Sequence, residues 1–378
     1  MSSRKLQRCT LLLSLLLAQH VAEAYNWVKC DDQSVDWDQA HQPISLSAIS
    51  FAPGSWRDAL LSSIDLINHN PSQFQLAAST DDTSIGFYND QNESWFSSDA
   101  DLFNGAAAIA FRVLDCDNDW FFGDGKKILE ADVVFNVEGG FSDSEQRWYT
   151  YTTSQYAPNL RAYGGNFIQF QAAAIHELGH LAGLNHTSDT YNSMGDSFTH
   201  VHNNDAKVTP YLGEDAANGL ITHYLYPSEV REDVAVSHFK HVGSFSEFSE
   251  HDFTELADAS GGQLASFEEN GETVYMVNRG QTVSFELTYE NNGRVFQETK
   301  VGFVVSTNDY ITTFDPLITR WNFNLGRNIV YTTAVTLEIP DNLTSGRAYW
   351  LGAIIDYEDT LAEVNERNNA TYLPIWVN

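Results

Sequence analysis

The segment HELGHLAGLNH, residues 176–186, contains three histidines and one glutamate whose types and spacing could bind a metal ion. His176 and His180 are four residues apart, so on an α-helix their imidazoles lie on one face, one turn apart. Gly183 tolerates the left-handed conformation that ends a helix, and the turned chain then brings His186 toward the pair. Three neutral imidazoles on a tetrahedral zinc ion leave one position open for water, as in catalytic zinc sites. Two alternatives stay open, namely a polar helix face without metal and a zinc site without activity.

The complete pattern H-E-x-x-H-x-x-G-x-x-H resembles the zinc signature of the metzincin metalloproteases. That family also has a methionine turn beneath the metal, and NSMG at residues 192–195 follows His186 at a spacing close to that of the matrixins. The resemblance implies that Met194 forms an apolar base under the three histidines. The sequence TPY that ends at Tyr211 resembles the family's wall of the S1′ pocket, so Pro210 and Tyr211 are candidates for that wall.

The metzincin resemblance covers roughly residues 26–228, where ADVVFN (131–136) resembles a sheet strand of such domains. It implies an α+β domain with a twisted mixed sheet, an active-site helix and one catalytic zinc ion held by the three histidines. It further implies an endopeptidase in which a zinc-bound water hydrolyses the peptide bond and Glu177 is the general base. The expected partners are protein or peptide substrates. No tyrosine stands two residues after Met194, and no pro-segment is evident.

Hydrophobic spacing predicts the elements that position these residues. Residues 55–68, 166–182 and 213–225 have apolar or alanine-rich patterns typical of helices, and the middle one carries the first two histidines. Residues 106–115 and 127–138 are rich in Val, Ile and Phe and are predicted as strands. Together they predict a mixed helix and strand domain over residues 25–228.

The character of the chain changes near residue 228. Residues 229–264 are polar and acidic, which predicts a linker and a first strand region before a domain at residues 265–378. Alternating apolar residues separated by turns then predict an antiparallel β-sandwich. The predicted strands lie at residues 282–291, 300–309, 334–341 and 347–356.

The C-terminal segments GQTVSFELTYENNG (280–293) and LGAIIDYEDTLAEVNERNN (351–369) resemble the start and end of a CARDB-type domain, an immunoglobulin-like sandwich. The resemblance implies adhesion or substrate docking, with a cell-surface or matrix ligand. In the closing run, Asp and Asn side chains are expected to cap a hairpin turn, with calcium or ligand binding as the alternative. The residues of this run are Asp356, Glu363, Asn365, Glu366, Asn368 and Asn369. A rival hypothesis for the whole chain is an inactive metzincin scaffold that binds partners through this sandwich.

Residues 1–24 have a basic start, a short apolar run and a small-x-small site, which predicts a secretory signal peptide cut near Ala24. The protein is therefore expected to be secreted. Cys30 and Cys116 are the cysteines left after cleavage, and in an oxidising compartment they are expected to form a disulfide. The alternative is that Cys30 is a latency ligand for the metal.

The formal net charge of −31 argues against nucleic-acid partners and against docking on anionic lipids. No segment after the signal reaches the about 18 apolar residues that a membrane span needs. Asp115, Asp117, Asp119 and Asp124 resemble an oxygen-rich loop and make calcium a candidate second ion, although the closing glutamate of an EF-hand is absent.

Two further patterns receive plainer interpretations. His200 and His202 could bind another ion, but an exposed loop pair is favoured, because two ligands rarely make a site. Glycosylation sequons occur at Asn92, Asn185, Asn342 and Asn369. Asn185 lies inside the zinc signature, where a glycan would block the site, so these sequons are interpreted as coincidental or unmodified.

Overall fold

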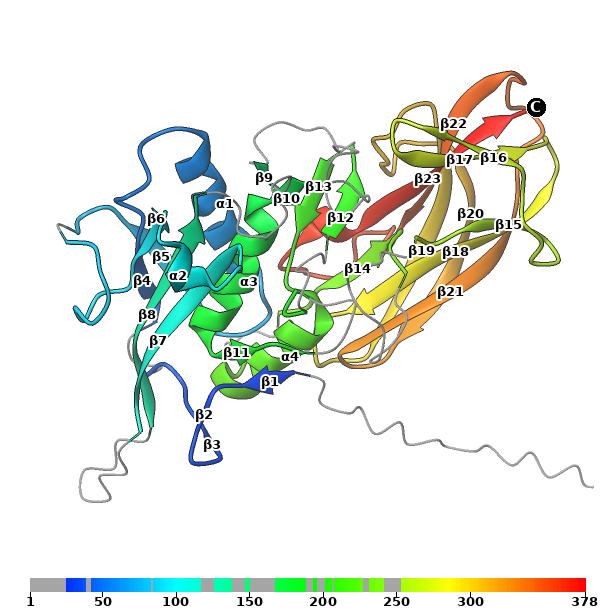
Figure 1. The fold of residues 1–378 in the computed structure, drawn as a ribbon. Coiled ribbons are helices and arrows are strands. Elements are labelled where there is room, and N and C mark those ends of the chain that lie inside the picture. The colour runs from blue at the N-terminus through cyan, green and yellow to red at the C-terminus, as the bar shows by residue number, and fades with distance from the viewer. Residues whose placement is uncertain are drawn as a thin grey trace, which may run out of the picture.

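A computed structural model gives the fold of the chain, and its two parts are coloured blue to green and yellow-green to red in Figure 1. One hydrophobic core gathers side chains from Trp27 to Tyr224, and a second gathers side chains from Val234 to Val377. We call these the N-terminal part and the C-terminal sandwich. The structure describes residues 25–38, 42–82, 84–116, 126–137, 147–149, 167–187, 193–195, 201–205, 207–226, 231–240 and 253–378. The predicted signal peptide lies outside these residues.

The N-terminal part contains the mixed sheet that the sequence predicts. Strand β8 (Lys127–Asn136) pairs parallel with β6 (Ser94–Ser97) and antiparallel with β7 (Ala108–Asp115). Strands β4 (Ile44–Ser47) and β5 (Leu76–Ser79) form a further parallel pair, which a bridge from Ser47 to Glu93 joins to the first three. Valine and phenylalanine side chains of β8 are fully buried, which explains its central place in the sheet.

Among the described residues, the N-terminal part contains four helices. They are α1 (Ser55–Asn68), α2 (Ala100–Phe103), α3 (Phe170–Ala182) and α4 (Gly213–Tyr224). The helix predicted from residue 166 was wrong at its start, because Phe167–Gln169 form strand β10, parallel to β9 (Arg147–Tyr149). Gln169 keeps an extended backbone, and the alanine-rich helix begins at the next residue. In the described part of the chain, no helix is long and apolar enough to cross a membrane.

Short strands complete the N-terminal part. Strand β1 (Asn26–Trp27) pairs antiparallel with β11 (Leu184–Asn185), directly after helix α3. Strands β2 (Lys29–Cys30) and β3 (Gln33–Ser34) form a small hairpin. Strands β12 (Val201–Asn204) and β13 (Lys207–Pro210) form a second hairpin, which projects toward the C-terminal sandwich (Figure 1).

The C-terminal sandwich is built from two sheets that enclose one core (Figure 1). On β18, alternate side chains from Val283 to Tyr289 are fully buried, which is the period-two pattern that predicts such a strand. One sheet contains β14 (Val234–Ser237), β18 (Thr282–Asn291), β15 (Leu256–Asp258) and β21 (Ile329–Glu338). The other follows the order β16 (Ser266–Glu269), β17 (Glu272–Val277), β23 (Ala370–Val377), β22 (Arg347–Ile354), β19 (Gln297–Ser306) and β20 (Leu317–Leu325).

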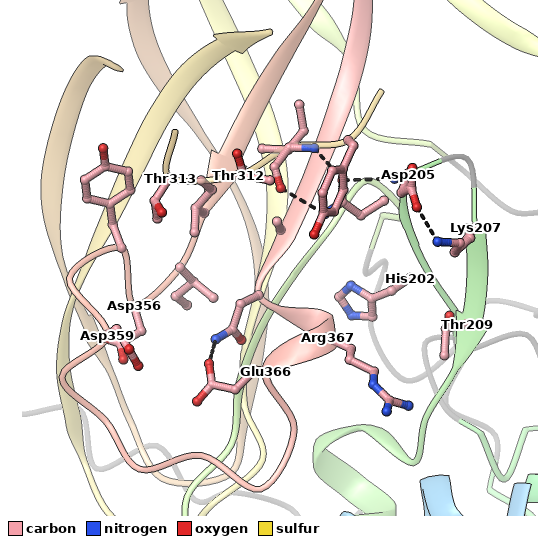
Figure 2. Close-up of a pocket in the computed structure, with 18 of the residues that line it drawn as sticks. His202, Asp205, Lys207, Thr209, Thr312, Thr313, Asp356, Asp359, Glu366 and Arg367 are labelled. Atoms are coloured by element: carbon pink, nitrogen blue, oxygen red, sulfur yellow. Dashed lines mark hydrogen bonds and ion pairs between the residues drawn. The ribbon is translucent and has the colours of Figure 1, made fainter. Parts of the chain in front are cut away.

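The two parts meet through buried polar contacts. The hydroxyl of Tyr211 donates to Glu290 Oε1 on β18 at 2.7 Å, and Asn203 Nδ2 donates to the hydroxyl of Tyr372 at 3.2 Å. Arg294 Nη2 donates to Asn218 Oδ1 on α4 at 2.8 Å. Figure 2 shows the β12–β13 hairpin facing the sandwich across a cavity. Buried hydrogen bonds of this kind require defined partners on both sides, so they fix how the hairpin meets the sandwich.

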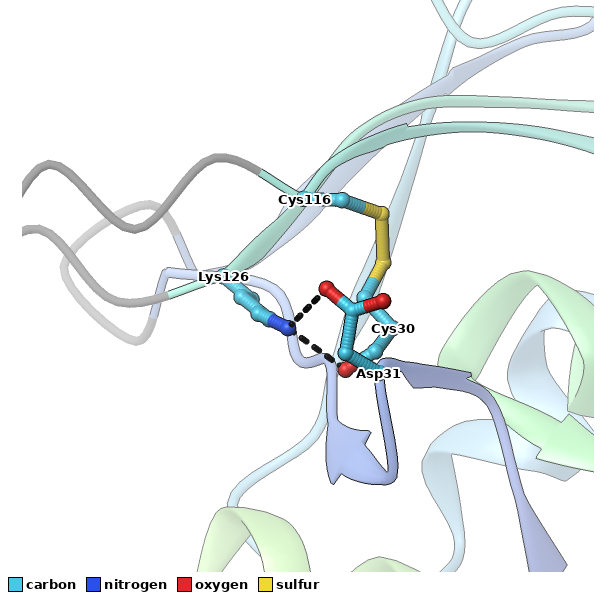
Figure 3. Close-up of a disulfide and its surroundings, with 4 residues drawn as sticks. All are labelled: Cys30, Asp31, Cys116 and Lys126. Carbon is cyan, nitrogen blue, oxygen red and sulfur yellow. Dashed lines mark hydrogen bonds and ion pairs between the residues drawn. A yellow bond between two sulfur atoms is a disulfide. The ribbon is translucent and has the colours of Figure 1, made fainter.

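Cys30 and Cys116 form the expected disulfide, which joins β2 to the end of β7 (Figure 3). The two Cα atoms are 5.5 Å apart, and 86 residues separate the cysteines in sequence. Lys126 Nζ donates to the carbonyl oxygen of Cys30 at 2.6 Å and to Asp31 Oδ2 at 3.0 Å. This bridge accounts for Cys30, so the alternative role of Cys30 as a latency ligand is wrong for this structure.

Replacing both cysteines by serine is expected to lower the free energy of unfolding by about 4 kcal/mol, because the bridge closes a long loop in the unfolded chain. Urea unfolding followed by tryptophan fluorescence measures this difference. The wild-type protein treated with a reducing agent serves as the control and should unfold at the same urea concentration as the double variant. An unchanged midpoint in both would contradict the expectation.

Candidate metal centre

Helix α3 and the turn after it bring three histidines together. His176 and His180 lie one turn apart on α3, and their ring centroids are 4.7 Å apart. Gly183 has a φ of 114° and ends the helix, as the sequence predicts for this glycine. The ring of His186 then lies 5.0 Å from that of His176 and 4.7 Å from that of His180. One ligand atom from each histidine lies within 4.8 Å of the others, so the three could hold a single metal ion.

Carbonyl oxygens fix the protonation of two of these rings. His176 Nδ1 lies 2.7 Å from the carbonyl oxygen of Ser193, and His180 Nδ1 lies 2.8 Å from that of Leu184. Because a carbonyl oxygen can only accept, each Nδ1 carries the hydrogen and each Nε2 keeps its lone pair. Burial, with a smaller contribution from His186, lowers the pKa of His176 to about 3. Burial also holds the pKa of His180 well below its usual range, so both rings are neutral at pH 7.

The three rings fit a zinc ion by their own chemistry. His176 Nε2 and His186 Nε2 lie 3.0 Å apart. The first of these atoms presents a lone pair, so the contact is favourable only if a proton or a cation lies between the two rings. Neutral imidazoles are ligands that zinc prefers, and three of them correspond to a catalytic rather than a closed structural set.

Glu177 lies next to the histidines and has a free oxygen. Its side chain is 4% exposed, and Oε2 has no hydrogen-bond partner among the described residues. Burial raises the pKa of this carboxyl to about 8, and the nearby charge of Arg112 partly opposes that rise. A carboxyl of raised pKa holds a proton more tightly than an exposed one, so Glu177 can take a proton from a neighbouring water once it is ionised.

Met194 lies beneath the helix, where the sequence resemblance places it. Its side chain is 1% exposed, and a Cβ added to Gly179 would overlap its sulfur atom. Gly179 therefore allows the helix to approach this methionine closely between the two histidines, a requirement that no sequence pattern marks. The backbone of Thr187 donates to the carbonyl oxygen of Met194 at 3.1 Å, which joins the segment after His186 to the same turn.

The candidate S1′ wall is buried and contacts the sandwich. Pro210 and Tyr211 are both buried, and the Tyr211 hydroxyl contacts His202 Nε2 as well as Glu290. The backbone of Leu212 accepts a hydrogen bond from Ser193 Oγ at 2.7 Å. His202 is thus a buried partner of Tyr211, and the prediction that it belongs to an exposed loop pair was wrong. His200 lies outside the described residues.

Arg112 supports the metal centre and was missed in the sequence. It lies on β7, and its Nη1 donates to the carbonyl oxygens of His180 at 3.2 Å and Leu184 at 3.3 Å. Its Nη2 donates to Asn185 Oδ1 at 2.7 Å. Leu184 is also the residue whose carbonyl orients His180. No sequence signal marks Arg112, because it lies more than sixty residues from its partners.

Replacing Arg112 by methionine is expected to weaken zinc binding by about 10- to 100-fold, the usual cost of losing an outer-shell partner. The carbonyl oxygen of Leu184 would lose its hydrogen bond from Arg112 and would hold the His180 ring less firmly. Competition with a chromophoric chelator measures the affinity. Arg320→Met, at an exposed pair with Glu358 on the sandwich, is the matched control. Wild-type affinity in the Arg112 variant would show that the guanidinium does not position the ring.

The segment after residue 24 also lies against the metal-binding turn. The backbone of Val28 donates to the carbonyl oxygen of Gly183 at 2.9 Å. A Cβ at Gly183 would meet Trp27 Cζ2 at 2.6 Å, so only glycine leaves room for the tryptophan. The Trp27 ring stacks on His223 of α4, with centroids 3.7 Å apart. This segment therefore holds the turn that carries His186.

The remaining candidates have mixed outcomes. Asp115 ends β7, whereas Asp117, Asp119 and Asp124 lie outside the described residues. In the C-terminal run, Asp356 Oδ2 accepts from the backbones of Thr360 and Leu361, as a capping role requires. The side-chain amides of three sequons form hydrogen bonds: Asn185 accepts from Arg112, Asn369 donates to Glu366, and Asn92 donates to the carbonyl oxygen of Ser45.

Comparisons with known proteins address both parts of the chain. Residues 49–224 match the family model described as matrixin. No curated protein sequence matches the chain.

Among solved structures, the chain is similar to a CARDB domain from Pyrococcus furiosus, described as in complex with di-metal ions, at 18% identity and a TM-score of 0.24. That match covers 40% of this chain and 95% of the other. A domain of a putative cell surface protein from Methanosarcina acetivorans gives 20% identity and a TM-score of 0.20, covering 26% of this chain and 75% of that one. The family model thus supports the predicted matrixin-like part.

Proposed function

We propose that this chain, which carries a matrixin-like domain over residues 49–224, is a secreted zinc-dependent endopeptidase. The observation that carries the proposal is the convergence of three imidazoles beside a buried carboxylate with an unpartnered oxygen. Matrixins are metallopeptidases, and the histidines fit the metal by donor type and protonation. A scaffold that only bound zinc would not need Glu177 in this place.

His176, His180 and His186 would hold the ion. Bound there, zinc would supply a Lewis acid for the peptide carbonyl and lower the pKa of a water molecule. Glu177 takes the proton of the attacking water at its free Oε2 and passes it to the leaving amine. The carbonyls of Ser193 and Leu184 keep the hydrogens of two imidazoles on Nδ1, so their Nε2 atoms would be free to bind the ion.

The substrate would lie extended along β7. This strand is at the edge of the β6-β8-β7 sheet and packs against α3. An extended peptide can add to such an edge through main-chain hydrogen bonds. Pro210 and Tyr211 would form the S1′ wall next to the methionine turn.

The predicted signal at residues 1–24 and the disulfide between Cys30 and Cys116 support secretion. Disulfides persist in oxidising compartments and are rare in the cytosol. The C-terminal sandwich would then meet extracellular ligands, such as a cell surface or matrix component.

Zinc-loaded protein is expected to hydrolyse an unstructured substrate such as casein, and 1,10-phenanthroline should abolish the reaction because it removes the metal. Added zinc should restore it. Release of acid-soluble peptides measures the rate. Hydrolysis that persists in the chelator would contradict the proposal. No hydrolysis of several folded and unfolded proteins would favour the rival function, a binding scaffold acting through the sandwich.

A further inference from the structure

A cavity of about 760 Å³ lies between the N-terminal part and the C-terminal sandwich. Its walls come from α1, the first turn of α3, the β12–β13 hairpin and the loops around Asp356 and Glu366. None of the three histidines of the metal centre lines it. The volume is within the range of sites that bind small molecules or single side chains, about 300–1,000 Å³.

Acidic side chains outnumber positively charged side chains on the walls of this cavity. Figure 2 shows Asp356, Asp359 and Glu366 on the sandwich side, across from the hairpin. Asp205 and Lys207 pair with each other on the hairpin. Burial and the charges of Asp359 and Asp356 raise the pKa of Glu366, as neighbouring carboxylates do.

Arg367 also lines the cavity, but its guanidinium lies toward another carboxylate. Its Nη1 lies 3.9 Å from Asp65 Oδ2 of α1, which is a carboxylate outside the lining. Figure 2 shows its side chain directed away from Glu366. In the described part of the chain, Asp359 forms no ion pair.

Two buried oxygens on the cavity walls have no donor among the residues that the structure describes. Gln171 Oε1 belongs to a side chain that is 2% exposed, and Asn369 Oδ1 to one that is 7% exposed. Both residues line the cavity, one from each part of the protein. Buried acceptors without partners cost free energy, so a ligand that donates hydrogen bonds would be stabilised here.

A metal ion does not fit this arrangement. In the described residues, only the three histidines form a group of three metal-ligating side chains whose ligand atoms all lie within 4.8 Å of one another. The carboxylates of the cavity are more widely spread, which suits a cation with several donors. A guanidinium group has five N–H donors and prefers carboxylate partners.

We propose that this cavity binds the cationic group of a basic side chain, arginine or lysine, of a polypeptide partner. The negative wall attracts the charge, and Gln171 Oε1 and Asn369 Oδ1 accept from its N–H groups. The proposal does not depend on hydrolysis, since the cavity is separate from the histidines.

Calorimetric titration of the full-length protein tests the proposal with Nα-acetyl-arginine methylamide and its neutral citrulline analogue. The arginine probe is expected to bind at least about tenfold more tightly, because hydrogen bonds to a charged group are the stronger ones. Asp359→Asn and Glu366→Gln should each remove most of this preference. Asp359 is exposed, so its variant should fold normally.

Glu358→Gln is the matched control, because Glu358 is an exposed neighbour that pairs with Arg320 outside the cavity. It should keep the arginine preference. Equal binding of the arginine and citrulline probes would overturn the proposal, and so would a preference that survives both cavity variants. Spermidine that binds more tightly than the arginine probe would assign the cavity to free polyamines and overturn the polypeptide part.

Discussion

Replacing Glu177 by glutamine is expected to lower kcat for peptide hydrolysis by about 10²–10⁴, the usual contribution of a general base. Glutamine has nearly the same shape but cannot take a proton from water. Because the three histidines are unchanged, the variant should still bind zinc. Steady-state cleavage of a quenched fluorescent peptide measures kcat, and atomic absorption measures the bound metal.

The matched control is Glu298→Gln, at an exposed position on β19. It should have wild-type kcat. Glu177→Asp should fall between glutamine and wild type, because the shorter side chain keeps the base but withdraws it from the attacking water. Full activity in Glu177→Gln at wild-type zinc content would exclude Glu177 as the base. Loss of zinc in that variant would instead show that Glu177 helps to hold the metal site together.

Replacing His186 by alanine is expected to weaken zinc binding by more than about 100-fold, since even outer-shell changes cost 10- to 100-fold. Hydrolysis should fall to background with it. His186 is exposed and follows the helix, so its loss should leave the core intact. Equilibrium dialysis with metal analysis measures the affinity, and circular dichroism checks the fold.

His69→Ala is the control for this experiment. His69 is partly exposed at the end of α1 and pairs with Asp65, away from the metal centre. It should bind one equivalent of zinc like the wild type. An His186 variant that retains tightly bound zinc would show that the ion is held by other residues, and the assignment of the three histidines would be wrong.

Polar contacts connect the C-terminal sandwich with the metal centre. Glu290 on β18 accepts a hydrogen bond from the Tyr211 hydroxyl. The backbone carbonyl of Leu212, the residue after Tyr211, accepts a hydrogen bond from Ser193 Oγ. The carbonyl of Ser193 in turn accepts from His176. All of these side chains are buried, so a continuous series of contacts leads from β18 to a metal-binding histidine. The sandwich is thus in contact with the proposed catalytic apparatus.

The sequence by itself determined the local parts of this protein. The spacing of His176 and His180 places both on one helix face, and Gly183 ends that helix, because helical geometry and backbone sterics act over a few residues. Helix α1 has the bounds that its apolar pattern predicts, and strand β18 matches residues 282–291. The predicted start of α3 was wrong, because the residues before Phe170 form strand β10, which pairs in parallel with a distant strand.

Only the tertiary structure decided which distant groups support the site. Arg112 reaches the turn after α3 from β7, Trp27 packs on Gly183 from the start of the described chain, and Glu290 reaches Tyr211 from the sandwich. The cavity beside Glu366 likewise exists only where two parts of the chain meet. Such contacts depend on complementary shape and hydrogen bonding between segments that are far apart in sequence. Complementarity of this kind leaves no periodic pattern in the sequence of either segment.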